Sequence, residues 1–428
     1  MDARLRHFAA TFRGCFSKPQ YRYFEIVLVA LLLCWEARTL TGLLRQVVAQ
    51  ATLSGLSRFF AKAPWATSEV AQTWRQRFDT QVAPLVAAEH ARQRATRPRR
   101  PGRPAATVVT GYLIGDDSTI EKTRGKQMAG LGKHYSTTAG TQVVGHSLVQ
   151  GLYVVQGRHC PLAPQLYRQR AVCAAEAVPF QSKIDLMDDL IRTFTPAADT
   201  QTHVLLDSWY AAKRLWKTAR SRGFQITTGL KSNRQLRVDD ASTPQGWRWQ
   251  PLTEYAAGLT DTDYRLVAWP SQDAEPRQVW VHVVTTRVRK LYRCQVILVK
   301  ESVDAPPTQV RFFASSDLHA DTTTLVGHLA ARWAVEVLFA DGKELLGLDH
   351  YQVMSADGIV RFWTLAWVAY CFLDEERARL RHAWQRHVTV GEARREVQRR
   401  HWNQLIHWMH QEFTAGATPQ AMFERLAA

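Results

Sequence analysis

Two apolar segments of this chain run directly into aspartates, and this pattern limits its fold more than any other. Val108–Gly115 has the β-branched and apolar content of a strand and is followed by Asp116 and Asp117. A second short apolar segment, His203–Leu206, ends at Asp207. In a parallel α/β sheet the ends of adjacent strands meet at one edge. We therefore expect acidic side chains from the two segments to converge there.

The sequence around these strands alternates between strand and helix patterns. Thr141–Val155 predicts two strands or one long bent strand, and Phe224–Gly229 predicts another. Gln181–Phe194 and Tyr210–Arg222 have the apolar spacing of amphipathic helices. The resulting order of strand, strand, strand, helix, strand, helix and strand predicts a mixed α/β sheet. Residues 235–315 are rich in strand patterns and look like an insertion into this sheet.

The chain is strongly basic. It has 55 Lys and Arg residues against 38 Asp and Glu, which gives a formal net charge of +17. This excess favours a polyanionic partner, with nucleic acid as the first expectation. No membrane partner is expected, because the apolar run Ile26–Trp35 is about half of the roughly 20 residues that a bilayer requires. The scattered cysteines form no C-x-x-C pair, so neither a zinc ribbon nor a disulfide framework is predicted.

Changes in composition and periodicity divide the chain into segments. Residues 1–90 have apolar side chains at helical spacing, whereas the next stretch is rich in Arg and Pro and cannot pack a core. Such a stretch either tethers two domains or lies on phosphates as a basic strap. The predicted segments are a helical, DNA-binding domain at 1–90, a basic linker at 91–106, the first part of the α/β core at 107–234, a β-rich insertion at 235–315, the second part of the core at 316–373 and basic C-terminal helices at 374–428.

A predicted helix at Thr324–Leu346 places three charged residues on one stripe. At about 100° per residue, Arg332 lies about 40° from Glu336, and Lys343 lies about 20° from it. The neighbouring residues are mostly apolar, so the helix is expected to be buried, where charged groups need a partner or a metal ion. Two interpretations stay open: an Arg–Glu ion pair beside an unrelated lysine, or one site that uses all three residues.

The aspartates leave a similar choice. Taken alone, each suits a turn or a helix cap, and Asp207 before Ser208 is a reasonable N-cap. Converging carboxylates without a Cys or His cluster instead form a hard oxygen site, which suits Mg²⁺ or Mn²⁺. The third acidic residue, Glu336, strengthens the second interpretation.

These motifs resemble the DDE transposases of bacterial insertion sequences. The most similar branch has a β-strand insertion before the glutamate and a Y-(2)-R-(3)-E-(6)-K signature, and Arg332, Glu336 and Lys343 reproduce its R-E-K spacing. Leu329 stands at the tyrosine position, which is a departure from the pattern. In the text GDDSTIEK we take Asp117, immediately before Ser-Thr, as the family's first acid and Asp116 as the alternative. The texts LLDSWY, GLKSNR and GKHYSTTAGTQVVGH are also similar to the family.

The resemblance implies a ribonuclease-H-like core interrupted by the β-rich insertion. It further implies catalytic and metal-binding roles for Asp117, Asp207 and Glu336, which would hold two Mg²⁺ (or Mn²⁺) ions. The implied activity is that of an endonuclease and strand transferase, which cuts DNA at the ends of an insertion sequence and joins the 3′ ends to target DNA. Arg332 and Lys343 would hold phosphates near the cut.

Further DNA-binding residues are expected from the same resemblance. Lys231 and Arg234 lie in GLKSNR, and Trp249 lies in the text WRW, where an aromatic side chain either stacks on a flipped base or belongs to the core. The expected partners are double-stranded DNA, as terminal inverted repeats and target, and a second copy of the chain on paired ends. The expected location is the bacterial cytoplasm, at the nucleoid when DNA is bound. The alternative is a DNA-binding protein that has kept this fold without catalysis, although binding alone would not require the acidic residues.

Overall fold

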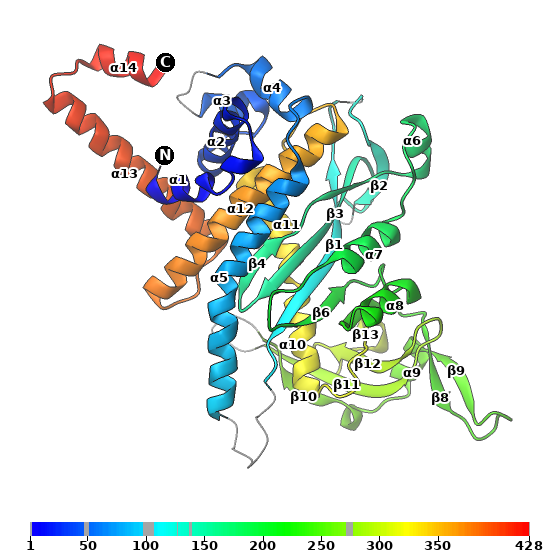
Figure 1. Ribbon diagram of the computed structural model, residues 1–428. Helices are drawn as coiled ribbons and strands as arrows, with labels where there is room; N and C mark the ends of the chain where they lie inside the picture. Colours follow the sequence, from blue (N-terminus) through cyan, green and yellow to red (C-terminus); the bar gives the residue numbers. More distant parts are fainter. Residues whose placement is uncertain are drawn as a thin grey trace.

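The computed structural model describes residues 2–46, 51–96, 107–125, 127–136, 139–270 and 277–427. A large mixed sheet forms its centre, in the strand order β10-β11-β12-β13-β7-β6-β1-β3-β2, and β4 and β5 also pair with β3 (Figure 1). A separate hairpin contains β8 and β9. The strands are β1 (Thr110–Glu121), β2 (Gly132–Ser136), β3 (Thr141–Val155), β4 (Arg158–Pro161), β5 (Gln165–Tyr167), β6 (Gln201–Leu206), β7 (Gln225–Leu230), β8 (Gln235–Asp239), β9 (Trp247–Pro251), β10 (Arg265–Ala268), β11 (Gln278–Arg287), β12 (Arg293–Lys300) and β13 (Arg311–Ser315).

The central strands have ribonuclease-H-like topology, as predicted. β1 pairs antiparallel with β3 and parallel with β6, and β6 pairs parallel with β7. The crossover into β6 passes through α7 (Lys183–Thr193), and the crossover into β7 passes through α8 (Lys213–Ser221). The sequence left open whether 141–155 forms one strand or two, and it forms one. Strands β10 to β13 of the β-rich segment continue the central sheet beyond β7.

Helices cover both faces of this sheet, and side-chain alternation shows which residues of β1 face which helix. A Cβ on Gly115 would meet Met187 of α7, so the odd-numbered residues of this part of β1 face α7. Tyr112 instead contacts His328 of α10 (Thr322–Arg332). The even-numbered residues therefore face α10 and α11 (Ala334–Leu346), because successive strand side chains point to opposite faces.

The long helix α12 (Ala356–Trp384) holds α11 against the sheet. Its Trp367 donates from Nε1 to Oε1 of Gln150 on β3, at 2.8 Å. Gly342 of α11 permits the close approach of the two helices, since a Cβ there would lie 2.9 Å from the Trp367 ring. Although α12 is long and apolar enough to cross a membrane, 78% of its most apolar window is buried inside the protein. It is thus a core helix of this structure.

The N-terminal helices share their core with the sheet. Phe8 lies 5.3 Å from Phe372 of α12 between ring centroids, and Arg361 of α12 donates to the backbone oxygen of Phe60. The N-terminal helices are α1 (Ala3–Ala10), α2 (Lys18–Leu33), α3 (Leu40–Arg45), α4 (Leu53–Ala61) and α5 (Thr67–Thr96), with the short 3-10 turn η1 (Arg13–Cys15). Residues 91–96, predicted as linker, are helical because α5 continues to Thr96, and residues 97–106 lie outside the described residues.

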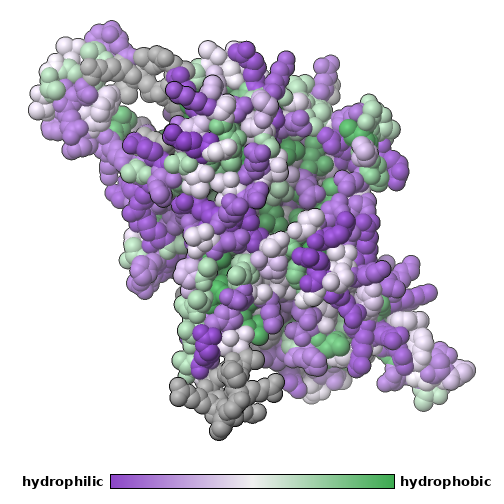
Figure 2. Space-filling model, in the orientation of Figure 1, coloured by the Kyte–Doolittle hydropathy of each residue, from purple (hydrophilic) through white to green (hydrophobic). Residues whose placement is uncertain are grey.

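The C-terminal helices are basic, yet many of their arginines bond within the protein. Arg394 donates to the backbone oxygens of Leu32 and Cys34, and Arg400 pairs with Asp2 and Glu376. The C-terminal part of α13 (Val390–Thr414) and the helix α14 (Pro419–Ala427) extend away from the body (Figure 1). The face of the molecule drawn in Figure 2 is mostly hydrophilic. The remaining elements are α6 (Arg170–Ala175), α9 (Leu252–Ala257), α13 (Val390–Thr414), α14 (Pro419–Ala427), η2 (Asp261–Asp263) and η3 (Pro307–Gln309).

Buried histidines make the stability of this fold sensitive to acid. Both ring nitrogens of His146 are engaged: Nε2 donates to the Ala129 oxygen at 2.9 Å, and Nδ1 accepts from the Tyr351 hydroxyl at 2.7 Å. Burial lowers the pKa of His146 to about 4. The unfolded chain has a His pKa of about 6.5, so between these two pKa values it binds a proton at this histidine and the folded chain does not. This contribution to stability is complete above about pH 6.5 and is lost as the pH falls toward 4.

We expect His146→Gln to remove part of this dependence. The pKa difference corresponds to about 2 kcal/mol of folding free energy between pH 7 and pH 5. Urea unfolding at both pH values should give a difference in stability that is smaller by about this amount in the variant. An equal pH dependence in the wild type and the variant would show that His146 is not buried in its neutral form.

Candidate active site

Two aspartates meet at the edge of the sheet where β1 and β6 lie side by side. These strands are parallel, with Gly115 opposite Leu206, so Asp116 and Asp207 follow as neighbours on the face of α10 and α11. Burial, together with the nearby charge of Asp207, raises the pKa of Asp116 to about 7. Burial also raises the pKa of Asp207. The sequence predicted that acidic side chains from the two strands converge at this edge. In the structure, Asp207 and Asp116 are neighbours there.

Arg332 and Glu336 complete this cluster from the helical side. The predicted helix at Thr324–Leu346 is divided at Trp333 into α10 and α11, with Arg332 as the last residue of α10. Arg332 lies between two acids: Nη1 is 3.7 Å from Oδ2 of Asp116, and Nη2 donates to Oε1 of Glu336 at 2.6 Å. The predicted ion pair between Arg332 and Glu336 is therefore present, and Arg332 also contacts Asp116.

Asp117, the sequence-based choice of the first acid, lies on the other face of β1 from Arg332 and Glu336. Its Oδ1 accepts from the Tyr210 hydroxyl at 2.8 Å, and its Oδ2 accepts from Lys183 Nζ at 2.5 Å. The sequence analysis ended the strand at Gly115, whereas β1 continues to Glu121. Consecutive residues inside a strand point to opposite faces, so only Asp116 can share a face with Glu336.

Asp207 also has the local role that its sequence suggested. Its Oδ1 accepts from the backbone N–H groups of Trp209 at 2.9 Å and Tyr210 at 3.3 Å. These two bonds fix the turn after β6 and leave the second carboxylate oxygen, Oδ2, outside them. A turn-forming aspartate and a ligand-holding aspartate are thus compatible at this position.

The predicted DNA-binding residues occupy different surroundings. Lys343 is half-buried on α11 with Nζ 3.5 Å from the Thr119 oxygen of β1, and Lys231 lies over the exposed ring of Trp209, at 5.1 Å from its centroid. Arg234 bonds internally, to the Ala211 oxygen at 2.6 Å. Lys343 and Lys231 thus lie near residues that flank the acids in sequence.

The two remaining positions singled out in the sequence make contacts with the β-rich segment. Trp249 lies on the β8–β9 hairpin, at the outer end of that segment in Figure 1, where it meets the ring of Trp247. Leu329, which stands at the tyrosine position, is buried in an apolar cluster with Val279 and Ile297 of β11 and β12. A leucine suits this position because the surrounding side chains are apolar.

Lys183 and Tyr210 were not identified from the sequence. Both hold Asp117 and so keep the two aspartates of the Asp-Asp pair on separate faces. Tyr210 lies three residues after Asp207, which is the one signal that could have linked it to the site. Lys183 begins α7, far from the acids in sequence, and no spacing rule connects it to them.

The three carboxylates have the ligand chemistry that a divalent cation prefers. Asp116, Asp207 and Glu336 supply hard oxygen donors. Burial first, and then the charge of Asp207, raises the pKa of Asp116. In the described part of the chain, no three acidic, histidine or cysteine side chains are grouped closely enough to hold a metal ion as they stand. Arg332 instead bridges Asp116 and Glu336.

Comparison with known families identifies the chain. The family model described as DDE superfamily endonuclease matches residues 11–252, more than half of the sequence. The chain belongs to the DDE superfamily endonucleases. A second family model, the transposase DDE domain, matches residues 181–372 of this DDE endonuclease, which includes Asp207 and Glu336. The predicted resemblance to DDE transposases is thereby confirmed.

No curated protein matches the sequence of this DDE endonuclease. Among solved structures it is similar to a piggyBac transposase synaptic complex with hairpin DNA, at 9% sequence identity and a TM-score of 0.43. That similarity covers 99% of this chain and 80% of the piggyBac chain.

Proposed function

We propose that this DDE endonuclease is the transposase of an insertion sequence. It cuts DNA at the terminal inverted repeats and joins the 3′ ends to target DNA, as a homodimer on paired ends. The observation that carries this proposal is the cluster of Asp116, Asp207, Arg332 and Glu336 at one edge of a ribonuclease-H-like sheet. DNA binding alone does not require three acidic residues at this edge of the sheet.

Asp116, Asp207 and Glu336 are the residues that would hold divalent cations, Mg²⁺ or Mn²⁺, with two ions as the proposed number. Such ions, when bound, supply charge stabilisation for in-line displacement at a phosphate. Arg332 has the planar fork that suits a phosphate, and it would exchange its bonds to Asp116 and Glu336 for bonds to the DNA backbone. Lys343, two turns along α11 from Glu336, adds a positive charge on the same side.

Strand cleavage with and without Mg²⁺ tests this proposal. A supercoiled plasmid that carries the DNA flanking the gene supplies the terminal repeats. We expect cleavage with Mg²⁺, no cleavage with EDTA, and no cleavage by Asp207→Ala, whose binding to the same DNA should be retained. Cleavage in EDTA, or equal cleavage by the variant, would contradict the proposal. Binding without any cleavage by the wild type would favour the alternative of a transposase fold that retains only DNA binding.

A further inference from the structure

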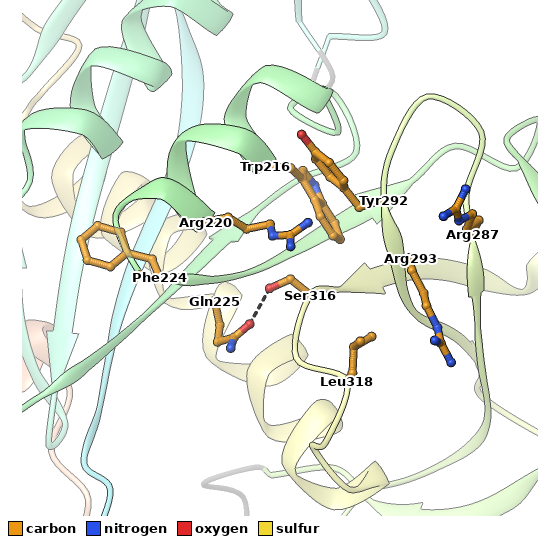
Figure 3. A pocket seen from close by; sticks show the side chains of 10 residues that line it. Trp216, Arg220, Phe224, Gln225, Arg287, Tyr292, Arg293, Ser316 and Leu318 are labelled. Carbon is orange, nitrogen blue, oxygen red and sulfur yellow. Dashed lines mark hydrogen bonds between the residues drawn. The ribbon is translucent and has the colours of Figure 1, made fainter.

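A cavity of about 470 Å³ lies at the edge of the sheet opposite to the acids (Figure 3). Arg220 of α8 and Arg287 and Arg293 of the β11–β12 hairpin line it, whereas no Asp or Glu does. None of these arginines has an ion pair among the residues that the structure describes. Asp317 lies between the lining residues Ser316 and Leu318 in sequence, but it does not pair with these arginines. Its carboxylate accepts from the backbone N–H groups of His319 and Ala320. The cavity therefore has an excess of positive charge.

Aromatic side chains hold this cavity in shape. The guanidinium of Arg220 lies over the Tyr292 ring at 4.8 Å, which orients it without neutralising its charge. Figure 3 shows Arg220 extending toward Trp216 and Tyr292, with Ser316 and Gln225 joined by a hydrogen bond below. Trp216 is fully buried, and its indole N–H has no acceptor among the described residues. The oriented guanidinium of Arg220 suits an anion.

A second cavity, of about 550 Å³, continues the first. Arg287 and Arg293 line both, and Arg237 of β8 joins them in the second, where the acidic residue is Asp239. Arg237 lies over the ring of Trp247, at 4.8 Å. The two cavities thus form one basic groove along the β-rich segment, with aromatic rings beside its arginines.

The groove and the acidic cluster lie at opposite ends of the parallel strands β6 and β7. Gln225, in the cavity lining, begins β7, whereas Asp207 follows the end of the parallel strand β6. Six residues of strand at about 3.3 Å each put these edges about 20 Å apart. That distance is somewhat more than half a turn of duplex DNA, at about 34 Å per turn.

We infer that Arg220, Arg287 and Arg293 form a second DNA-binding site, which takes backbone phosphates of duplex DNA away from the cut. This inference rests on the proposed function, since it takes the anion to be DNA. Arginine forks pair with phosphate oxygens in two-point contacts, and the absence of base-specific groups makes such a site independent of sequence. It would strengthen the binding of DNA that extends beyond the acidic cluster.

Salt dependence of DNA binding tests the inference. Binding of a 30-base-pair duplex is measured by fluorescence anisotropy over a range of salt concentrations, for the wild type and for the variant Arg220→Ala, Arg287→Ala and Arg293→Ala. Each lost phosphate contact reduces the slope of log K against log salt by about 0.9, so the slope should become smaller by about 2 to 3. The corresponding triple lysine variant should keep the wild-type slope, because it keeps the charges.

The control removes the same net charge from arginines that already have carboxylate partners: Arg277, Arg311 and Arg399. The inference is supported if the slope falls in the first alanine variant but not in the control. It is overturned if both slopes fall equally or if neither falls. Binding of inorganic phosphate is measured as well, and a first variant that loses only this binding, with duplex binding unchanged, also overturns the inference. Thermal unfolding identifies a misfolded variant. Cleavage with Mg²⁺ is measured on the wild type alone, so failure of this inference is distinct from failure of the proposed function.

Discussion

Asp116→Asn will abolish DNA strand cleavage by this DDE endonuclease. Asp116 shares a face of the sheet with Arg332 and lies beside Asp207, and its carboxylate is one of the proposed cation ligands. A cation of this kind contributes several kcal/mol to transition-state stabilisation, so its loss should slow cleavage by about 10³-fold or more. The measurement is the rate of strand cleavage with Mg²⁺ at saturating DNA.

Asp117→Asn is the matched control, one residue away. Asp117 faces Lys183 and Tyr210 on the opposite side of β1, so this variant should lose some stability but keep cleavage within about tenfold of the wild type. The reverse result, with cleavage lost in Asp117→Asn and kept in Asp116→Asn, would show that Asp117, the sequence-based choice, is the first acid. It would also require β1 to change its register.

Asp374→Asn should lower the free energy of unfolding by about 3–5 kcal/mol. Asp374 is fully buried on α12, where its carboxylate accepts from Arg158 Nε at 2.7 Å and from Arg377 Nη2 at 2.5 Å. These bonds tie β4 to α12. The asparagine keeps the shape of the side chain but leaves two arginines without their counter-charge in the interior. Urea unfolding followed by circular dichroism would measure the loss.

Glu301→Gln is the comparison for this effect. Glu301 also accepts from two arginines, Arg277 and Arg311, but this group is half exposed. Solvent screens exposed ion pairs, so the change should cost less than about 1 kcal/mol. Equal costs at the two positions would mean that burial does not set the strength of the Asp374 network.

Much of the fold follows from local sequence patterns. The strand at His203–Leu206 and the helix at Gln181–Phe194 lie within a few residues of β6 and α7, because apolar periodicity records which side chains are buried. The continuation of the central sheet by β10 to β13 was not predicted. Strand pairing depends on contacts between distant segments, for which a single sequence holds no direct signal.

The site shows the same limit at the scale of single residues. The spacing of Arg332 and Glu336 fixed their shared stripe, because helical geometry is regular over four residues. The choice between Asp116 and Asp117 instead depended on where β1 ends, and strand ends are poorly defined by local sequence. A shift of one residue reverses the face of every side chain. The contact between Lys183 and Asp117 is long-range and left no pattern in the sequence.

Binding of Mn²⁺ tests the central claim most directly, which is that Asp116, Asp207 and Glu336 together hold divalent cations. Free Mn²⁺ can be followed by electron paramagnetic resonance as protein is added, with Glu301→Gln as the control for the loss of an acidic residue. We predict that the wild type and the control remove Mn²⁺ from solution, and that the double variant Asp207→Asn and Glu336→Gln does not. Equal Mn²⁺ binding by the double variant and the wild type would contradict the account.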